Sequence, residues 1–433
     1  MRYDRYIFHV DVNSAFLSWS AVERLKKNPD SVDLRTIPSA VGGDVKKRRG
    51  VVTAKSIPAK KMGVKSGEPV VTALKKCPQL LVIPGEFSVY RKYSKAFIKI
   101  LHGYSPAVQQ VSIDEAFMDM TGLEILYADS DYENLQFPLS LANRIKDEIY
   151  QSLGFTVNIG ISTNKLLAKM ASDFSKPNKI HTLYPHEIEN KLWGLPLGKL
   201  FGCGKATVQK LHKVGIKTIG DAANADERML TSLLGESVGA SLYRSANGIG
   251  SSHVNIGNND AKSYSNETTI AFDIDADNYA AEMYAVIREL SDSVAYRLRR
   301  DNMFAKTIGV VVKTDSFERH SMQLQLEAHT HNTELIYNTA SRLMDKLLLG
   351  EEGLFSKGGK IRLAGISATQ LDDGEYRQMN ILDVVDQDIL YDSNDIQKAH
   401  SKPSATDDVI DKIRLEFGKN SIVRAGQLKK KNR

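Results

Sequence analysis

The sequence has few of the features that mark secreted or membrane proteins. Its 433 residues include only two cysteines, Cys77 and Cys203, which are far apart and show no pairing pattern. This excludes a disulfide framework and argues against a thiolate metal site. No apolar run approaches the roughly 18 residues that a membrane span requires, and no small-residue cleavage site follows the charged N-terminus. We therefore expect a cytoplasmic protein with no membrane partner.

The composition is that of an ordinary globular chain, with 42% hydrophobic and 25% charged residues, and its length suits about three domains. The net charge is +6, but the positive charge is concentrated in one segment. Between Val41 and Ile83 the chain has ten basic residues against only Asp44 and Glu68. Such a segment suits a polyanionic partner, although a solvated basic face explains the composition equally well.

An acidic residue stands at the end of the first predicted strand. Residues Tyr6 to Val12 have the pattern of a strand that runs into a helix. Alternation along this strand places Ile7, His9 and Asp11 on one face. Asp11 is therefore predicted at the strand end, where a side chain can reach a site.

Two more acidic residues lie in the segment QQVSIDEAFMDMT, which has the pattern of a β-hairpin. Asp114 and Glu115 are adjacent, so in an unbroken strand they would point to opposite faces. A turn or bulge can bring them together, and we place both residues at the hairpin tip.

A third unit is predicted in FTVNIGISTNKLLAKMASDFSKPN. The pattern indicates a strand over Phe155–Ile161, a capping pair at Ser162 and Thr163, and then a helix. Lys165 falls in the first turn of this helix, where a cation opposes the helix dipole. A bound phosphate would remove the conflict, and extension of the side chain into water is the alternative.

The remaining chain divides into three parts. The segment LPLGKLFGCGKATVQKLHKVGIKTIGDAA has two short helix-turn-helix patterns, and NGIGSSHVNIGNNDAK resembles a linker. Alternating strands and helices from Ser263 to Gln370 predict a separate α+β unit, followed by a tail with one terminal helix. His329 and His331 have no further ligand near them, so we expect surface residues there and not a metal site.

The three carboxylates, Asp11, Asp114 and Glu115, are the candidate catalytic residues. Two like charges about 4 Å apart repel by about 4 kcal/mol at an effective dielectric near 20, so a cluster needs cations or protons. Oxygen ligands of this type suit magnesium, and two such ions can clamp the attacking and leaving oxygens of a phosphoryl transfer. Acidic surface turns without function are the alternative, and from spacing alone they are the commoner explanation.

These motifs resemble those of a known protein family. The chain is similar to the Y-family, or translesion, DNA polymerases, particularly the UmuC/DinB-like bacterial members, over nearly its whole length. FHVDVNSAF resembles the first metal motif, VSIDEAFMDMT the S-I-D-E motif, and GISTNKLLAKMASDFSKPN the Lys-bearing segment. The hairpin at 202–211 resembles the thumb's helix-hairpin-helix, and KSYSNETTI with YRLRRDNMFAKTIGVVVK resembles the little finger.

The resemblance implies an α+β multidomain fold shaped like a right hand. It has a palm of mixed β-sheet and helices, small fingers, a helical thumb with the helix-hairpin-helix, and an α+β little finger. The implied boundaries are palm 1–22 and 84–175, fingers 23–83, thumb 176–247, linker 248–261, little finger 262–371 and C-terminal tail 372–433.

The implied activity is that of a DNA-directed DNA polymerase for error-prone translesion synthesis in DNA repair and damage tolerance. Asp11 and Asp114 would bind two Mg²⁺ ions, Glu115 the catalytic ion, and the Val12 carbonyl the nucleotide ion. Phe16 falls at the steric gate that excludes a ribose 2′-hydroxyl, although helical spacing alone favours a core residue there.

The implied partners are primer-template DNA, deoxynucleoside triphosphates and a sliding clamp. Lys165 and Lys60 would contact the triphosphate. Backbone amides of the hairpin at Gly202, Gly204 and Lys205 would hold a DNA phosphate. The tail segment YRQMNILDVV resembles a clamp-binding peptide, although an ordinary turn before a helix is an equal alternative. Its candidate contacts are Gln378, Met379, Ile381 and Leu382.

Three positions depart from the family pattern. Asn13 stands where many members carry a second Asp, and we interpret it as a helix cap. Ile57 and Lys60 stand where a Tyr and an Arg are frequent, and Lys offers a point charge in place of a bidentate fork. A catalytically silent DNA-binding repair scaffold and a palm-type nucleotidyl cyclase are the alternatives. Retention of all three carboxylates argues against the first, and the helix-hairpin-helix against the second.

Overall fold

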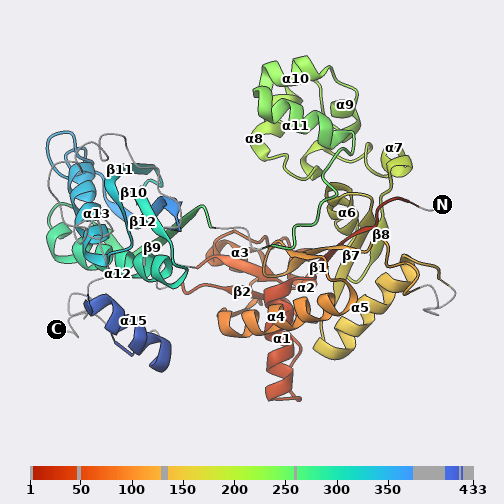
Figure 1. Cartoon of the computed structure of the whole chain (residues 1–433), viewed down its shortest axis with the longest axis horizontal. Coiled ribbons are helices and arrows are strands. Elements are labelled where there is room, and N and C mark those ends of the chain that lie inside the picture. The colour runs from red at the N-terminus through yellow and green to blue at the C-terminus, as the bar shows by residue number, and fades with distance from the viewer. Residues whose placement is uncertain are drawn as a thin grey trace, which may run out of the picture. The chain divides into compact units, whose positions relative to one another are not determined.

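The computed structural model divides by its internal contacts into two units, Met1–Asn258 and Asn259–Arg433, both drawn in Figure 1. Within the described part of the chain, no helix is long and apolar enough to cross a membrane. The residues that the structure describes are 3–45, 50–127, 135–257, 261–373, 405–418 and 421–422.

A mixed five-stranded sheet with helices on both faces forms the centre of the first unit (Figure 1). Most of its strands are antiparallel neighbours, and only the last pair is parallel. Its elements are β1 (Ile7–Val12), α1 (Ala15–Lys27), α4 (Phe87–Tyr104), β5 (Val108–Gln110), β6 (Glu115–Asp119), α5 (Leu139–Leu153), β7 (Val157–Ser162), α6 (Lys165–Ser172) and β8 (Ile180–Thr182).

The first strand, β1, lies at the middle of this sheet, in the order β5-β6-β1-β7-β8. Alternate side chains of β1 point to opposite faces of the sheet, and the two faces have different surroundings. Phe8 and Val10 are fully buried in the core that α4 and α5 share, whereas His9 donates a hydrogen bond to Ser172 of α6 on the other face. The predicted common face of Ile7, His9 and Asp11 is therefore the face that α6 covers.

Helix α6 approaches β7 closely because of one glycine. A Cβ at Gly160 would lie 2.0 Å from the carbonyl oxygen of Ala168 and 2.4 Å from the backbone nitrogen of Ser172. No other residue fits without moving the helix. The G-I-S sequence thus sets how near α6 lies to the end of β1.

A small three-stranded sheet, in the order β3-β2-β4, forms the range predicted as fingers. Its first helix is well specified by sequence, because the Ser56 hydroxyl accepts a hydrogen bond from Ala59 N and Pro58 occupies the first turn. The elements are β2 (Ser39–Gly42), β3 (Val52–Lys55), α2 (Ile57–Lys61), α3 (Val70–Lys76) and β4 (Leu81–Ile83).

Short helices make up the range predicted as thumb. Their shared core includes Leu167 and Met170, so this helical region packs against α6 on the side away from the sheet. Its elements are the 3₁₀ turns η1 (Pro185–Glu187) and η2 (Leu197–Lys199) and the helices α7 (Ile188–Lys191), α8 (Lys205–His212), α9 (Ile219–Ala223), α10 (Glu227–Leu234) and α11 (Glu236–Ala246).

The second unit is an antiparallel four-stranded sheet, in the order β11-β10-β12-β9, with two long helices in its core. The α+β architecture predicted for this part is confirmed. Buried ion pairs join a further C-terminal helix to this unit. The elements are β9 (Ser263–Ile274), α12 (Tyr279–Arg300), β10 (Phe304–Thr314), β11 (Arg319–Thr330), α13 (Thr333–Leu348), β12 (Ile361–Asp372) and α15 (Ala405–Phe417).

Two local predictions are wrong. Asn164 caps α6 by accepting a hydrogen bond from Leu167 N at 2.9 Å, whereas the predicted cap residue Ser162 ends β7 and donates to the Leu183 carbonyl oxygen. His331 is not a surface residue, because it is 8% exposed and stacks on the ring of Phe304 at 4.2 Å.

The predicted linker begins as part of the first unit. Lys165 N donates to the Ser251 carbonyl oxygen at 3.0 Å, and Asn164 Nδ2 donates to the Gly248 carbonyl oxygen at 2.9 Å. Val254 is 4% exposed and packs with Ile7. The segment up to Val254 therefore lies on the first unit, which a composition rich in glycine and asparagine did not indicate.

Candidate active site

Strand register places two of the three predicted carboxylates face to face. In the antiparallel pairing of β1 with β6, Asp11 lies directly opposite Glu115. Opposite residues of such a pair point to the same face, with Cβ atoms about 5 Å apart. Asp11 is 7% exposed, and Glu115 is half-buried. The fold therefore brings together two acidic side chains that are far apart in the sequence.

Two lysines balance this pair of carboxylates. Lys169 of α6 donates to Glu115 Oε1 at 2.6 Å and to Asp11 Oδ2 at 3.3 Å. Lys176, in the segment after α6, donates to Asp11 Oδ1 at 2.7 Å. We call Asp11, Glu115, Lys169 and Lys176 the active-site cluster.

The two acids of this cluster differ in their pKa. Burial raises the pKa of Glu115, and the hydrogen bond with Asp11 raises it further. Burial acts in the same direction on Asp11, but the hydrogen bond with Glu115 and the charge of Lys176 bring the pKa of Asp11 below its ordinary value. The pKa values of these two neighbouring acids therefore shift in opposite directions, upward for Glu115 and downward for Asp11.

The third carboxylate, Asp114, lies in the hairpin turn as predicted. Its backbone carbonyl oxygen accepts a hydrogen bond from Val12 N at 3.0 Å, which ties the turn to the end of β1. Its side chain accepts a hydrogen bond from the Ser112 hydroxyl at 2.6 Å. The turn therefore brings Asp114 to the rim of the site.

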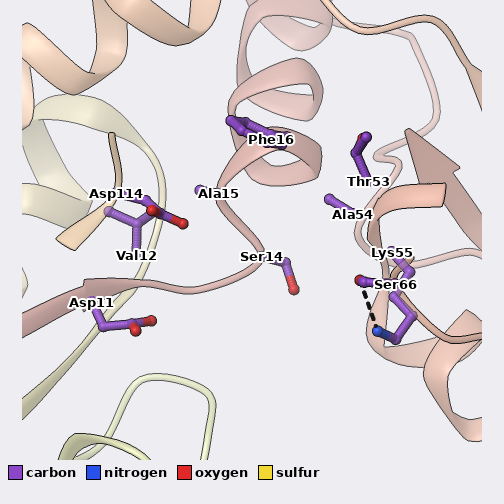
Figure 2. A pocket seen from close by; sticks show the side chains of 10 residues that line it. All are labelled: Asp11, Val12, Ser14, Ala15, Phe16, Thr53, Ala54, Lys55, Ser66 and Asp114. Atoms are coloured by element: carbon purple, nitrogen blue, oxygen red, sulfur yellow. Dashed lines mark hydrogen bonds between the residues drawn. The ribbon is translucent and has the colours of Figure 1, made fainter. Parts of the chain in front are cut away.

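A cavity of about 240 Å³ opens beside Asp11 and Asp114. Figure 2 shows these two carboxylates on one side of it, facing Lys55 and Ser66 on the other. The lining between them is made mostly of small side chains, together with the Phe16 ring. Its members are Asp11, Val12, Ser14, Ala15, Phe16, Thr53, Ala54, Lys55, Ser66 and Asp114.

Phe16 has two environments. Its ring stacks on Tyr90 at 4.7 Å between centroids, so the residue belongs partly to the core, as helical spacing indicates. The same ring lines the 240 Å³ cavity, as Figure 2 shows. The aromatic packing fixes the ring at the cavity wall.

A second cavity of about 490 Å³ adjoins the first at Asp11, Ser14 and Lys55. Lys60 and Lys176 also line it, so three lysines border one space. Burial and the charge of Lys60 lower the pKa of Lys55. An anion in this cavity would relieve that crowding.

Lys165 lies elsewhere. Its ammonium donates to Gln109 Oε1 at 3.2 Å and lies 5.8 Å from the centre of the Phe117 ring. It lines neither cavity. The helix N-terminus that a phosphate was predicted to occupy is satisfied by the protein, because the Ser251 carbonyl and the Asn164 side chain accept its amide hydrogens. A contact of Lys165 with phosphate stays a prediction.

The predicted DNA-contacting hairpin lies on the thumb surface. Gly202 has φ 85°, a left-handed value that favours glycine, and Gly204 is the N-cap residue of α8. Both glycines and Lys205 are exposed. A phosphate can therefore reach this backbone. The predicted clamp-binding residues 378–382 lie outside the described residues.

The site fits a divalent cation by the chemistry of its donors. Carboxylate and backbone oxygens are hard ligands, and the crowded pair Asp11 and Glu115 needs positive charge. The lysines supply that charge in the structure. Among the described residues, however, no three acidic, histidine or cysteine side chains converge to hold one ion.

Lys169 and Lys176 were not predicted from the sequence as site residues. Lys169 lies on α6 four residues after Lys165, and it forms an ion pair with Asp173 a further four residues on. This spacing was visible in the sequence, but only the packing of α6 shows that it faces β1. Asn13 was interpreted as a helix cap, and this is wrong, because its side chain hydrogen-bonds to Thr156, Asn158 and Asn178.

Comparisons with known proteins agree with this fold. Residues 10–173 match the impB/mucB/samB family, and residues 261–381 match the C-terminal domain of that family. A "DNA polymerase IV" of Clostridium acetobutylicum is 39% identical over 99% of this chain and 100% of its own length. A "DNA polymerase IV 1" of Bacillus subtilis is 34% identical over 98% of this chain and 94% of its own. A solved Y-family DNA polymerase chimera, 23% identical, superposes with a TM-score of 0.70 over 84% of this chain and 98% of the chimera.

Proposed function

Since the chain belongs to the impB/mucB/samB family of Y-family DNA polymerases, we propose that the cavities beside Asp11 are the site where it extends a primer. The protein is a DNA-directed DNA polymerase for translesion synthesis. The observation that carries the assignment of the site is the register of β1 and β6. It sets Glu115 opposite Asp11, and Asp11 lines a cavity together with Asp114.

Polymerases of this family depend on divalent metal ions, and we assign two Mg²⁺ ions to this site. Asp11, Asp114 and Glu115 would hold them, together with the carbonyl oxygen of Val12. Bound there, the ions would activate the primer 3′-hydroxyl and neutralise the charge on the leaving pyrophosphate. The protein's own part is to bring Asp11 and Glu115 together on paired strands. Burial, followed by the neighbouring Asp11, raises the pKa of Glu115.

The three lysines of the 490 Å³ cavity suit the triphosphate of an incoming deoxynucleotide. Lys55, Lys60 and Lys176 line this space, and each offers up to three donors to phosphate oxygens. Lys176 also contacts Asp11, so it can join the charge of the nucleotide to the acidic site. Lys165 is the weaker candidate, since its ammonium bonds to Gln109.

Phe16 is proposed as the steric gate. Its ring forms part of the wall of the cavity that Asp11 and Asp114 border. Packing on Tyr90 keeps the ring from moving aside. A sugar placed between the carboxylates and this ring would have no room for a 2′-hydroxyl.

Primer-template DNA would contact the thumb and the fingers. The exposed backbone at Gly202, Gly204 and Lys205 offers amide donors to a phosphate without regard to sequence. The basic segment from Val41 to Ile83 would add attraction for the polyanion. The tail residues Gln378, Met379, Ile381 and Leu382 are proposed to bind the sliding clamp.

Primer extension tests the site. The wild-type protein, Asp114→Ala and Phe16→Ala are compared with each deoxynucleotide and ribonucleotide, on undamaged and abasic templates, with Mg²⁺. Asp114→Ala should abolish extension, and Phe16→Ala should admit ribonucleotides. Asp119→Asn is the control, because this carboxylate lies at the far end of β6, the strand that follows Asp114, and it contacts Arg5 and does not line the cavity. Normal extension by Asp114→Ala would overturn the assignment.

A further inference from the structure

Asn158 has a fixed side-chain orientation. It is fully buried on β7, and its Nδ2 donates to the carbonyl oxygens of Ser172 at 3.0 Å and Ser175 at 2.6 Å. Because carbonyl oxygens only accept, the amide cannot be flipped. Its Oδ1 therefore points the other way, where it accepts a hydrogen bond from Lys179 N at 3.3 Å.

The orientation of Asn158 dictates that of Asn13. Asn13, which is 7% exposed, donates from Nδ2 to Asn158 Oδ1 at 3.0 Å. Its own Oδ1 then accepts from the Thr156 hydroxyl at 2.9 Å and from Asn178 N at 2.9 Å. Every bond in this buried network thus has one permitted direction.

This amide pair holds the segment that carries Lys176. The four backbone positions that it bonds are Ser172 and Ser175 before the lysine, and Asn178 and Lys179 after it. Between these anchors, the Lys176 ammonium contacts Asp11 at 2.7 Å. Asn13 itself lines the same 490 Å³ cavity as Lys176.

We propose that Asn13 is a positioning residue, which sets the Lys176 ammonium between Asp11 and the incoming nucleotide by fixing the segment 172–179. The inference rests on the proposed role of Lys176 in binding the triphosphate. An aspartate at position 13 cannot serve, because it has no hydrogen to donate to Asn158 Oδ1 and would place two acceptors in contact. The network therefore requires an amide at position 13.

The test is a double-mutant cycle with Asn13→Asp, Lys176→Ala and both together. Equilibrium binding of each deoxynucleotide to a complex with a chain-terminated primer is measured, along with KM and kcat on an extendable one. Each single variant should weaken nucleotide binding on the order of tenfold, the size of losing one hydrogen bond to a charged group. The double variant should bind no worse than Lys176→Ala, because the two residues act through one ammonium group.

Hydrogen exchange supplies a readout that does not depend on nucleotides. Asn13→Asp should speed exchange of the Asn178 and Lys179 amides, which the amide pair protects. Ser162→Ala is the matched control: it also removes a buried hydrogen bond from β7, to the Leu183 carbonyl, but away from the segment 172–179. It should leave both exchange there and nucleotide KM unchanged.

The outcomes separate the two proposals. Unchanged exchange in Asn13→Asp, or effects of the two substitutions on nucleotide binding that multiply, would overturn the role of Asn13. Faster exchange together with unchanged binding in Lys176→Ala would overturn only the role of Lys176 with nucleotides. Where Asn13→Asp does not fold, Thr156→Val removes one bond to Asn13 Oδ1 without adding charge, and it should shift exchange in the same direction by less.

Discussion

Each of the two units contains a buried group of opposite charges, but the two groups differ in how their donors and acceptors are used. In the active-site cluster, lysines meet carboxylates beside a cavity. In the second unit, arginines of α12 and α15 meet aspartates of the same two helices. We call this second group the helix-docking cluster, and its members are Asp292, Arg299, Asp407, Asp411 and Arg414.

The helix-docking cluster is saturated. Arg299 donates to Asp411 through Nε at 2.6 Å and Nη2 at 3.1 Å, and its Nη1 donates to the His331 carbonyl oxygen and the Thr333 hydroxyl. Arg414 and Asp292 are 6% and 8% exposed at their side chains and lie 2.7 Å apart. Four of the five guanidinium hydrogens of Arg299 are thus used within the protein, which leaves little for a ligand.

The active-site cluster is built differently. Its cations are point charges on flexible stems, and its acids are crowded enough to raise the pKa of Glu115. The comparison teaches that buried charge by itself does not mark a site. Unrelieved charge next to a cavity does, because only there can a substrate or an ion improve the balance.

The largest expected loss of activity is that of Glu115→Gln. This substitution removes one negative charge and keeps the shape of the side chain. Extension should fall on the order of 10²–10³-fold, because an electrostatic partner of the reaction is lost. The free energy of unfolding should change by less than about 1 kcal/mol, since relief of the repulsion from Asp11 offsets the lost Lys169 pair. Single-turnover extension and urea unfolding measure the two quantities. A stability loss as large as that of the next variant would erase the contrast between the clusters.

Arg299→Met should give the opposite result. Removing one partner of a buried ion pair costs about 3–5 kcal/mol, because Asp407 and Asp411 then lose their cation. Hydrogen exchange over α15 should rise sharply, while the rate of extension in the palm stays the same. Arg300→Met is the matched control, because Arg300 is half exposed and, among the residues that the structure describes, forms an ion pair with its neighbour Asp301 alone. Less than about 1 kcal/mol is therefore expected. Equal losses for both arginines would contradict the saturated character of the cluster.

Gly160→Ala tests the dependence of the active-site cluster on a close helix approach. The added Cβ would meet the backbone of α6 at 2.0 Å, so the helix has to move and carry Lys169 with it. We expect a stability loss of about 1–3 kcal/mol together with weaker extension. Gly103→Ala, in α4 with nothing within 4 Å of the new atom, should instead stabilise by up to about 1 kcal/mol. Thermal unfolding and extension compare the two, and a neutral Gly160→Ala would show that α6 is free to shift.

The acidic residues of the candidate site could be predicted from the sequence, whereas its lysines Lys169 and Lys176 could not. Strand alternation placed Asp11 at the end of a strand and the hairpin pattern placed Asp114 in a turn, because both patterns are local. Glu115 was predicted at the hairpin tip but is the first residue of β6. The pairing of Asp11 with Glu115 depends on a register between strands about a hundred residues apart in sequence, which no local pattern gives. Lys169 was missed because a lysine on a short helix is usually solvated. Here the close packing of α6 on β7 at Gly160 turns the Lys169 side chain toward Asp11 and Glu115.

The fold shows the same limit. The α+β class and the motif order were predicted and are confirmed, since periodicity and long motifs carry that information. Asn13 was misassigned because the sequence around it also fits a helix cap. His331 was misassigned because the sequence around it also fits an exposed strand. Their burial is decided by distant partners, Asn158 for the first and Phe304 for the second.

His9, beside the active-site cluster, is a buried titratable group that stays neutral in the folded protein. Ser172 Oγ donates to the Lys169 carbonyl oxygen, so the hydrogen between His9 Nδ1 and Ser172 belongs to the histidine. The other ring nitrogen is buried and has no hydrogen-bond partner in the described structure. Burial, followed by the charge of Lys169, lowers the pKa of His9 to about 3.

This neutral histidine predicts a pH dependence of stability. Below the ordinary value of 6.5, the unfolded chain takes up a proton that the folded chain refuses, so stability falls as the pH drops from about 6.5 toward about 3. His9→Gln cannot take up that proton. Between pH 7 and pH 5 it should therefore lose about 2 kcal/mol less than the wild type, at about 1.4 kcal/mol for each pH unit below 6.5. Urea unfolding of both proteins at the two pH values measures the difference, and parallel losses would mean that His9 takes up the proton in the folded state as well.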